Sequence, residues 1–286
     1  MGRKSFMGEM LCSTGAFIGR VNDRDHRGFL RIADSLTADA FEFMMYESWY
    51  EKAGAVLSDF IAGGYRFPVF HVEKRIGEYI GLGGEENRKE AEKRFSLNCE
   101  YAARLGSEKL VLHLWNGMPS DRNFQRHMAA YPVFADIAGR FGLLLTVENV
   151  VCAVGSPISH LLALHAAYPD AAFTYDTKMA AFHREETALF TTPGLSILRA
   201  GKVRHIHLND YGGGYRDFEH LRVLHLGEGH VDIAGFTGAL LRAGYRGTVT
   251  LECSCMRPDG TLTPEKMNAS LAIARELMKG CDRYAE

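Results

Sequence analysis

The segment KLVLHLWNGMPSDRNFQRHMAAYPVFADIAGRFGLLLTVEN, residues 109–149, contains the pattern that decides the fold. An apolar run at 109–116 has the length of a strand, and residues 121–142 have the length and apolar spacing of a helix. Gly142 comes just before the next apolar run, at 143–149, in the position that helix C-termini favour for glycine. A strand, a helix and a second strand in this order predict a parallel βαβ unit.

The same alternation runs along the whole chain. An open doubly wound sheet is the alternative, but STGAFIG at 13–19 is a poor match to its glycine-rich phosphate turn. Eight consecutive units therefore predict a closed (β/α)8 TIM barrel, which takes about 250 residues. Because no linker or low-complexity stretch interrupts the pattern, we expect a single domain over residues 1–286. The candidate strands are 10–17, 40–47, 67–73, 109–116, 143–149, 171–177, 203–210 and 247–254.

The composition is that of an ordinary globular protein and excludes several classes. Of the 286 residues, 47% are hydrophobic and 24% are charged, and the net charge is -2, so no basic surface for nucleic acid is expected. No apolar run reaches the roughly 20 residues of a membrane span, and the N-terminus lacks the apolar region of a signal peptide. We expect a cytoplasmic protein without nucleic-acid or membrane partners; the sequence is compatible with a homo-oligomer. Its six cysteines are expected to be reduced thiols: Cys12, Cys99, Cys152, Cys253, Cys255 and Cys281.

Polar side chains recur at the ends of the candidate strands, where a parallel barrel should be apolar. A charged group in a dry site costs several kcal/mol unless it is paired or bound to a metal. The C-terminal ends of barrel strands are also where active sites of this architecture lie. We therefore interpret these residues as candidates for a functional site. They are His71, Glu73, His113, Trp115, Glu148, Asp176, His207 and Glu252.

Strand alternation points four of these side chains toward the barrel axis. Each shares its face of the strand with threonine or histidine, whereas the opposite faces carry bulky apolar residues that suit the helical layer. Two glutamates, one aspartate and one imidazole supply hard donors that suit Mn²⁺, Mg²⁺ or Co²⁺, and Zn²⁺ is also compatible. The pairs on the inward faces are Glu148 with Thr146, Asp176 with Thr174, His207 with His205, and Glu252 with Thr250.

At these positions the chain resembles the xylose isomerase-like superfamily of metal-dependent barrels. The superfamily includes sugar isomerases and epimerases, hydroxypyruvate isomerases, inosose dehydratases and endonuclease IV-type repair enzymes. The resemblance implies one divalent ion, with Mn²⁺ as the first expectation, held by Glu148, Asp176, His207 and Glu252. The matching segments are TVEN (146–149), YDT (175–177), HIHLND (205–210), LGEGHVD (226–232) and TLEC (250–253).

Two positions depart from the patterns of the superfamily. The endonuclease and ketose 3-epimerase branches carry a histidine three residues after the strand-6 aspartate, where this chain has Met179. The epimerases also tend to carry an arginine where this chain has Gly213, and the endonuclease pattern needs an Asp-x-His after strand 7 that is missing here. The departures disfavour DNA repair. His183 or Arg216 could replace the missing side chains from neighbouring loops.

The resemblance implies a metal-dependent isomerase or epimerase of a sugar or sugar-like carbonyl compound. Such an enzyme removes a proton beside a carbonyl and stabilises an enediolate through the metal. Glu148 and Glu252 would exchange the protons, with His113 as a further acid or base, and His205 would support the ligands. The residues expected to contact the substrate are His71, Glu73, Trp115, His183 and Arg216.

Other functions on the same scaffold stay open at this point. A lyase, either inosose dehydratase-like or C-glycoside-cleaving, would begin with the same proton abstraction. Abasic-site DNA repair of the endonuclease IV type is disfavoured by the missing ligands, and a catalytically dead sugar-binding barrel by the intact ligand set. No basic cluster marks a phosphate site, so we expect an unphosphorylated carbohydrate-like substrate.

The chain after strand 7 contains residues with expected structural roles. Asp210 is expected to hold the strand-7 loop, and Asp232 suits the N-cap of the helix that follows. The glycines of YGGGY, residues 211–215, are expected to make a flexible loop over the site that could act as a lid.

Overall fold

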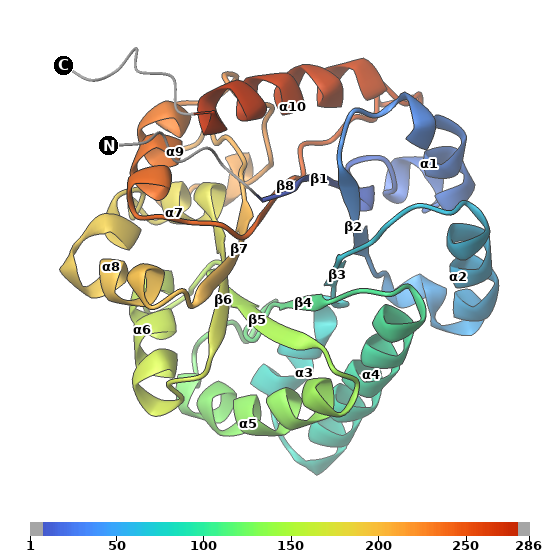
Figure 1. The fold of residues 1–286 in the computed structure, drawn as a ribbon. Coiled ribbons are helices and arrows are strands. Elements are labelled where there is room, and N and C mark those ends of the chain that lie inside the picture. Colours follow the sequence, from blue (N-terminus) through green and yellow to red (C-terminus); the bar gives the residue numbers. More distant parts are fainter. Residues whose placement is uncertain (1–7, 280–286) are drawn as a thin grey trace. The chain divides into compact units, whose positions relative to one another are not determined.

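The computed structural model describes residues 8–279, and its eight strands are ordered β1 to β8 in one closed barrel (Figure 1). Every neighbouring pair with a described register is parallel. The predicted (β/α)8 class is thereby confirmed. The strands are β1 (Met10–Ser13), β2 (Ala40–Met44), β3 (Val69–His71), β4 (Lys109–Leu112), β5 (Leu144–Glu148), β6 (Ala172–Asp176), β7 (Val203–His207) and β8 (Thr248–Leu251).

Each candidate strand of the sequence contains one of these strands, but the observed strands are shorter. The run at 10–17 shows why: β1 ends at Ser13, and a 3-10 turn at Thr14–Ala16 follows, capped by the Ser13 hydroxyl, which accepts from the Gly15 amide at 3.1 Å. The helices end where glycine was expected to end them, since Gly106, Gly142 and Gly201 have φ of 72°, 70° and 66°.

Helices follow the strands in the expected order. The contacts of the chain gather into two compact units, which we call the first unit (Met1–Asp39 with Tyr175–Glu286) and the second unit (Ala40–Thr174). The first unit contains α1 (His26–Ile32), α7 (Thr177–Phe182), α8 (Thr192–Arg199), α9 (Ile233–Arg242) and α10 (Pro264–Met278). The second unit contains α2 (Ala53–Ala62), α3 (Arg75–Leu82), α4 (Glu85–Arg104), α5 (Phe124–Arg140) and α6 (Pro157–Ala167).

The second unit has an aromatic core beneath β2 and β3. Phe43 stacks on Phe70 with ring centroids 5.0 Å apart, and Phe60 meets Phe43 and Phe67 edge-on. All four side chains are buried. Offset and edge-on aromatic pairs contribute about 0.5–1.5 kcal/mol each beyond their buried area. This cluster therefore stabilises β2 and β3, and β3 carries His71 directly after Phe70.

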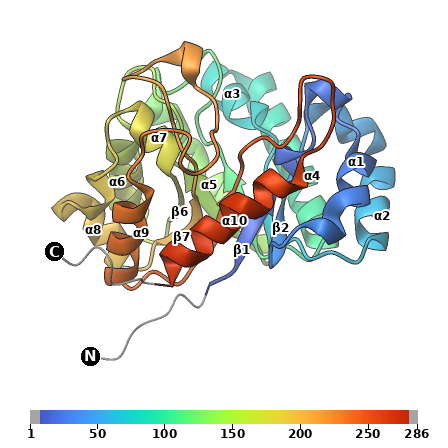
Figure 2. The same cartoon turned by 90° about the horizontal axis from the view of Figure 1, so that it is seen from above.

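In the first unit, α10 contacts β1 and β8, and Figure 2 shows it running past β1. Its polar face ties down the segment that leads from α1 to β2. Asn268 donates to the Ser35 carbonyl at 2.7 Å, and Arg275 forms an ion pair with Asp39 at 2.8 Å. Asp39 in turn accepts from the amide of Met10, the first residue of β1, at 2.8 Å.

Two further features of the described chain concern its cysteines and its helices. Five cysteines are buried and are not joined in disulfides, and Cys281 lies outside the described residues. None of the helices between residues 8 and 279 combines the length and hydropathy needed to cross a bilayer.

Candidate functional site

The ends of β6, β7 and β8 bring three of the predicted ligands together in the first unit. His207 Nδ1 lies 3.3 Å from Glu252 Oε2. The side-chain amide of Asn209 donates to Asp176 Oδ2 at 3.1 Å and to Glu252 Oε2 at 2.8 Å. Asp176 and His207 are fully buried, whereas the Glu252 side chain is 11% exposed. Two carboxylates and an imidazole therefore converge at these strand ends.

A second cluster lies at the ends of β3, β4 and β5 in the second unit. His113 Nε2 lies 2.8 Å from Glu148 Oε2, and His71 Nε2 lies 3.5 Å from the same oxygen. All three side chains are buried. Burial lowers the pKa of His113 to about 4, although the charge and the hydrogen bond of Glu148 oppose this shift. The imidazole of His113 is thus neutral at pH 7.

Strand register explains why these side chains share a face. In the second unit Glu148 lies beside Thr174 in the sheet, and the hydroxyls of Thr146 and Thr174 are 2.7 Å apart. Neighbouring residues of a parallel sheet point to the same side, so Glu148 lies on the face of these threonines. In the first unit His207 lies beside Thr250 and His205 beside Thr248.

His205 lies one step earlier on the face that it shares with His207. Its Nδ1 atom and the Thr248 hydroxyl are 2.6 Å apart, and its side chain is fully buried. The imidazole rings of His205 and His207 meet edge-on with centroids 5.0 Å apart. This placement suits the supporting role that the sequence predicts for His205.

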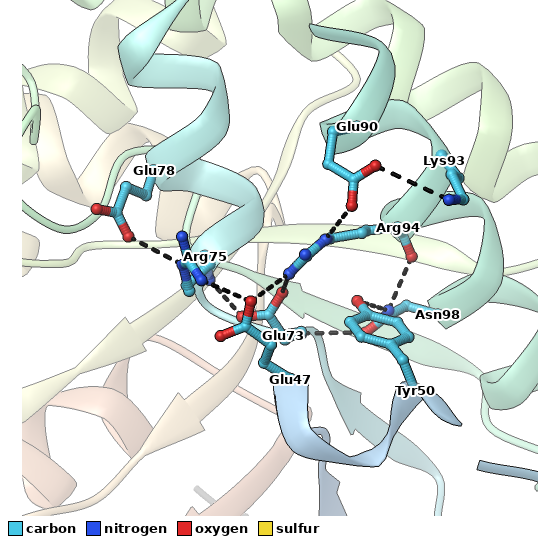
Figure 3. Close-up of polar contacts among 9 residues, drawn as sticks. All are labelled: Glu47, Tyr50, Glu73, Arg75, Glu78, Glu90, Lys93, Arg94 and Asn98. Carbon is cyan, nitrogen blue, oxygen red and sulfur yellow. Dashed lines mark hydrogen bonds and ion pairs between the residues drawn. The ribbon is translucent and has the colours of Figure 1, made fainter. Parts of the chain in front are cut away.

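Glu73 does not follow the alternation that predicts an inward side chain, because β3 ends at His71. Its carboxylate accepts from the Arg75 amide at 2.8 Å and pairs with Arg94 of α4 at 3.3 Å (Figure 3). Arg94 also bonds Glu47 and Glu90. Burial raises the pKa of Glu73, and the bonds from Arg75 and Arg94 oppose this. The Glu73 side chain therefore links the end of β3 to α4, and its described partners are Arg75 and Arg94, not His71 or His113.

Trp115 is fully buried in an aromatic group that includes Phe124 and His160. Its indole N–H donates to the Val150 carbonyl at 3.2 Å. The ring therefore supports the segment after β5, which starts directly after Glu148.

In the first unit the backbone at Arg216 lies close to the backbone beside His183. His183 caps the C-terminus of α7, and the Arg216 amide donates to the carbonyl of Phe182 at 2.8 Å. The loop after β7 thus returns to the end of α7. This contact is compatible with the expectation that His183 or Arg216 replaces the family side chains missing at Met179 and Gly213. Met179 contributes only its backbone, since its amide donates to Asp176 Oδ1 at 3.1 Å and Asp176 caps α7.

The loop after β7 is organised by two aspartates, the buried Asp210 and the exposed Asp232. Asp210 accepts from the amides of Tyr211, Gly227, Gly229 and Val231 at 2.8–3.1 Å, which agrees with its predicted role. Asp232 caps α9, also as predicted.

The YGGGY glycines have a packing reason that the sequence did not reveal. The Tyr211 hydroxyl donates to the Gly214 carbonyl at 2.9 Å, and a Cβ added to Gly213 would lie 2.3 Å from that hydroxyl. Glycine is therefore required by the close approach of the chain to Tyr211, which leaves the predicted lid without support from this contact.

Asn209 is the residue that the sequence reading overlooked. It lies on the same alternation as His205 and His207, two residues further along the motif HIHLND, and this parity was the available signal. Its bonds to Asp176 and Glu252 arise only when the ends of β6 and β8 meet beside β7.

The donor set of each cluster is compatible with a divalent cation. In the first unit one amide holds two carboxylates close together beside an imidazole, an arrangement in which a cation offsets the repulsion of like charges. In the second unit His71, His113 and Glu148 each offer a donor atom within 4.8 Å of the others. These are the oxygen and nitrogen donors that Mn²⁺, Mg²⁺, Co²⁺ and Zn²⁺ accept.

Comparisons with known proteins agree with this architecture. The family model described as xylose isomerase-like TIM barrel matches residues 30–277. A D-tagatose 3-epimerase-like protein is similar in structure with a TM-score of 0.65 and 19% identity, covering 94% of this chain and 98% of that one. The D-allulose 3-epimerase of Methylomonas sp. has a TM-score of 0.64 and 16% identity, covering 98% of this chain and 96% of that one.

A putative sugar phosphate isomerase/epimerase of Anabaena variabilis has a TM-score of 0.70 and 12% identity, covering 95% of this chain and 98% of that one. At these identities the likeness to the solved structures is one of fold. A comparison with curated protein sequences finds no match.

Proposed function

Because this chain belongs to the xylose isomerase-like TIM barrel family, we propose that it is a metal-dependent isomerase or epimerase of a sugar or sugar-like carbonyl compound. The observation that carries the proposal is the convergence of three of the predicted ligands. The Asn209 amide bridges the carboxylates of Asp176 and Glu252, and the His207 imidazole lies beside Glu252. Buried carboxylates held together in this way are costly unless a cation is bound. The solved structures with the same fold include sugar epimerases, which supports the substrate class.

The proposed metal ligands are Asp176, His207 and Glu252 from the first unit and Glu148 from the second unit. Support for Glu148 comes from its position at the end of β5, its face of the strand and the resemblance of TVEN to the family pattern. The oxygen-rich set favours Mn²⁺ as the first expectation, followed by Mg²⁺, Co²⁺ and Zn²⁺. The bound ion would supply Lewis-acid stabilisation to a developing negative charge on substrate oxygen.

Proton transfer is assigned to the two glutamates. A carboxylate that is ionised at neutral pH can accept the proton from the carbon beside the carbonyl, and a second carboxyl group that carries a proton can give it to the opposite face. Glu252 is 11% exposed at its side chain, so it can exchange its proton with solvent, whereas Glu148 exchanges through His113 at 2.8 Å. The neutral imidazole of His113 is suited to this relay.

Substrate hydroxyls are assigned to three further side chains, those of His71, His183 and Arg216. His71 lies next to His113 and Glu148, with the two imidazole centroids 4.9 Å apart. His183 and Arg216 come from the adjoining ends of α7 and the loop after β7. Glu73 and Trp115, which were expected to contact substrate, are assigned to supporting contacts, since their polar groups are engaged with Arg94 and with the Val150 carbonyl.

The test begins with metal analysis and ends with hydrogen exchange. Purified protein should contain, or take up after chelation, about one divalent ion per chain. The Mn²⁺-loaded protein is then incubated in deuterated solvent with a panel of ketoses, aldoses and keto-inositols. Exchange of the hydrogen beside the carbonyl, followed by NMR, identifies a substrate. Release of water or of an aglycone in the same tubes would favour the lyase alternative.

Two variants and one control locate the base. Glu148→Gln and Glu252→Gln keep the side-chain size and should lower exchange by more than about a hundredfold, the usual scale of acid–base catalysis. The control His205→Gln should cost less, because His205 is bonded to Thr248 behind the ligands. Wild-type exchange rates in both metal-loaded glutamate variants would refute the assignment of the base.

A further inference from the structure

We infer that Asn209 is a positioning residue that sets the carboxylates of Asp176 and Glu252 for metal binding. This inference rests on the proposed function, since it requires that a metal binds. The two hydrogens of the Asn209 amide are directed at Asp176 Oδ2, 3.1 Å away, and at Glu252 Oε2, 2.8 Å away. One neutral side chain from the end of β7 therefore bridges carboxylates from the ends of β6 and β8.

The orientation of this amide is determined by its surroundings. The backbone N–H of Glu252 donates to Asn209 Oδ1 at 3.2 Å, so the amide oxygen faces β8 and the NH₂ group faces the carboxylates. The reverse orientation would place an oxygen against two carboxylates and an NH₂ group against an N–H donor. Asparagine offers both a donor and an acceptor on one planar group, which aspartate and leucine of similar size do not.

The backbone of Asn209 is held from the other side. The Thr177 hydroxyl donates to the Asn209 carbonyl at 2.6 Å and accepts from the Asn209 amide at 2.8 Å. Thr177 directly follows Asp176, so the residue after one ligand fixes the residue that orients it. Asn209 is only 1% exposed, and the bridge is therefore shielded from solvent.

The energetic role of the bridge follows from these contacts. The carboxylates of the buried Asp176 and of Glu252, whose side chain is 11% exposed, repel each other, and the amide donors hold them in place while no cation separates their charges. Ligands that are already oriented lose less conformational freedom when the metal arrives. Hydrogen-bonding partners behind metal ligands typically account for about 10- to 100-fold in metal affinity. Asn209 should contribute on this scale.

The experiment measures Mn²⁺ binding, with no substrate, to chelator-treated protein by titration calorimetry. Asn209→Ala and Asn209→Ser should both bind Mn²⁺ about 10- to 100-fold more weakly than the wild type. In parallel, Co²⁺ is bound and its visible absorption recorded, because a change in ligand geometry alters band position and intensity. Both variants should give an altered Co²⁺ spectrum, which a general loss of stability would not produce. Circular dichroism melts establish that each variant is folded.

Asn98 provides a matched control from the second unit. It is fully buried and equally bonded, since its amide donates to the Tyr50 hydroxyl and the Arg94 carbonyl at 2.8 Å and accepts from the Glu73 amide at 3.0 Å (Figure 3). Asn98→Ala should lower the melting temperature but leave Mn²⁺ affinity and the Co²⁺ spectrum at wild-type values.

The outcomes separate this inference from the proposed function. Wild-type affinity and spectrum in the folded Asn209 variants would overturn the positioning role while leaving the metal-dependent function intact. If Asn209→Ala does not fold, the smaller change in Asn209→Ser decides the question. A wild-type protein that binds neither Mn²⁺ nor another divalent ion would refute the proposed function, and the inference with it.

Discussion

The Nε2 atom of His113 lies 2.8 Å from Oε2 of Glu148 in the second unit, and both side chains are buried. Burial lowers the pKa of His113 to about 4 from an ordinary value of 6.5, against the opposing effect of Glu148. A neutral imidazole beside a carboxyl group that has gained a proton can take up that proton and pass it on. The same shift makes the stability of the protein depend on pH.

The first prediction concerns that dependence. The unfolded chain binds a proton at His113 below about pH 6.5, whereas the folded chain resists protonation until about pH 4, so stability falls as the pH drops through this window. Between about pH 7 and pH 5, metal-free wild type should lose about 2 kcal/mol more than His113→Gln. Urea unfolding at both pH values measures the difference. An equal loss in both proteins would contradict the prediction.

The second prediction concerns nucleic acid. Met179 stands where the endonuclease pattern has a metal-binding histidine, and its described polar contact is a backbone bond to Asp176. The net charge of -2 also gives no general attraction for a phosphate backbone. We expect no cleavage of an abasic-site duplex by Mn²⁺- or Zn²⁺-loaded protein, measured by gel against a metal-free control. Metal-dependent cleavage would show that other residues complete a multinuclear site.

The sequence predicted the barrel because the signals for it are local. Apolar runs, helix-length spacing and glycine at Gly106, Gly142 and Gly201 each depend on a few adjacent residues. Strand ends depend instead on where the chain turns, and β3 stops at His71, two residues earlier than the alternation suggested. Glu73 lies beyond this end of β3, and its carboxylate pairs with Arg94.

Parity placed His207, Thr250 and His205 on one face of the sheet, as the register confirms. The ligand set itself stays a prediction. Asn209 has the same parity but escaped notice because its chemistry depends on partners 33 and 43 residues away in the sequence. The glycines of the YGGGY loop are ambiguous for a related reason. At Gly213 the chain passes close to the Tyr211 hydroxyl, and in the sequence a glycine required by close packing looks the same as a glycine in a flexible loop.

The third prediction concerns the loop after β7. Asp210 accepts four backbone N–H groups, three of them from residues 227–231, and it is 1% exposed. Removing a buried charged acceptor leaves these donors without a partner at about 1–3 kcal/mol each. Asp210→Ala should therefore raise the amide exchange rates of Gly227, Gly229 and Val231 by more than about tenfold, measured by NMR or mass spectrometry.

A matched aspartate controls this experiment. Asp232 is exposed and caps α9 by accepting from the Gly235 amide at 2.8 Å. Asp232→Ala should cost about 1 kcal/mol, as an N-cap does, and raise exchange only in the first turn of α9. Unchanged protection of the 227–231 amides in Asp210→Ala would show that packing, and not the carboxylate, holds the loop.

The fourth prediction concerns the segment after β5. Asp121 is buried and accepts from the amides of Ala153, Val154 and Gly155 at 2.6–2.9 Å and from His160 at 2.8 Å. Burial raises the pKa of this carboxyl, but these hydrogen bonds outweigh it and hold the pKa well below its usual 3.8. Its stabilising effect is therefore fully present above about pH 3.8 and is lost as the pH falls below that value.

Asp121→Asn tests both the size and the sign of this effect. The variant keeps the volume but turns one acceptor into a donor that faces backbone N–H groups, so it should lose about 3 kcal/mol at neutral pH. The difference from wild type should shrink as the pH falls from about 5 to about 3, because the unfolded wild-type chain then takes up a proton at this carboxyl and the folded chain does not. The exposed Asp136, paired with Arg140 on α5, serves as the control, and Asp136→Asn should stay within about 0.5 kcal/mol. Urea unfolding across this range measures both variants. A difference for Asp121→Asn that is as large at about pH 3 as at about pH 7 would mean that its stabilisation comes from shape and not from charge.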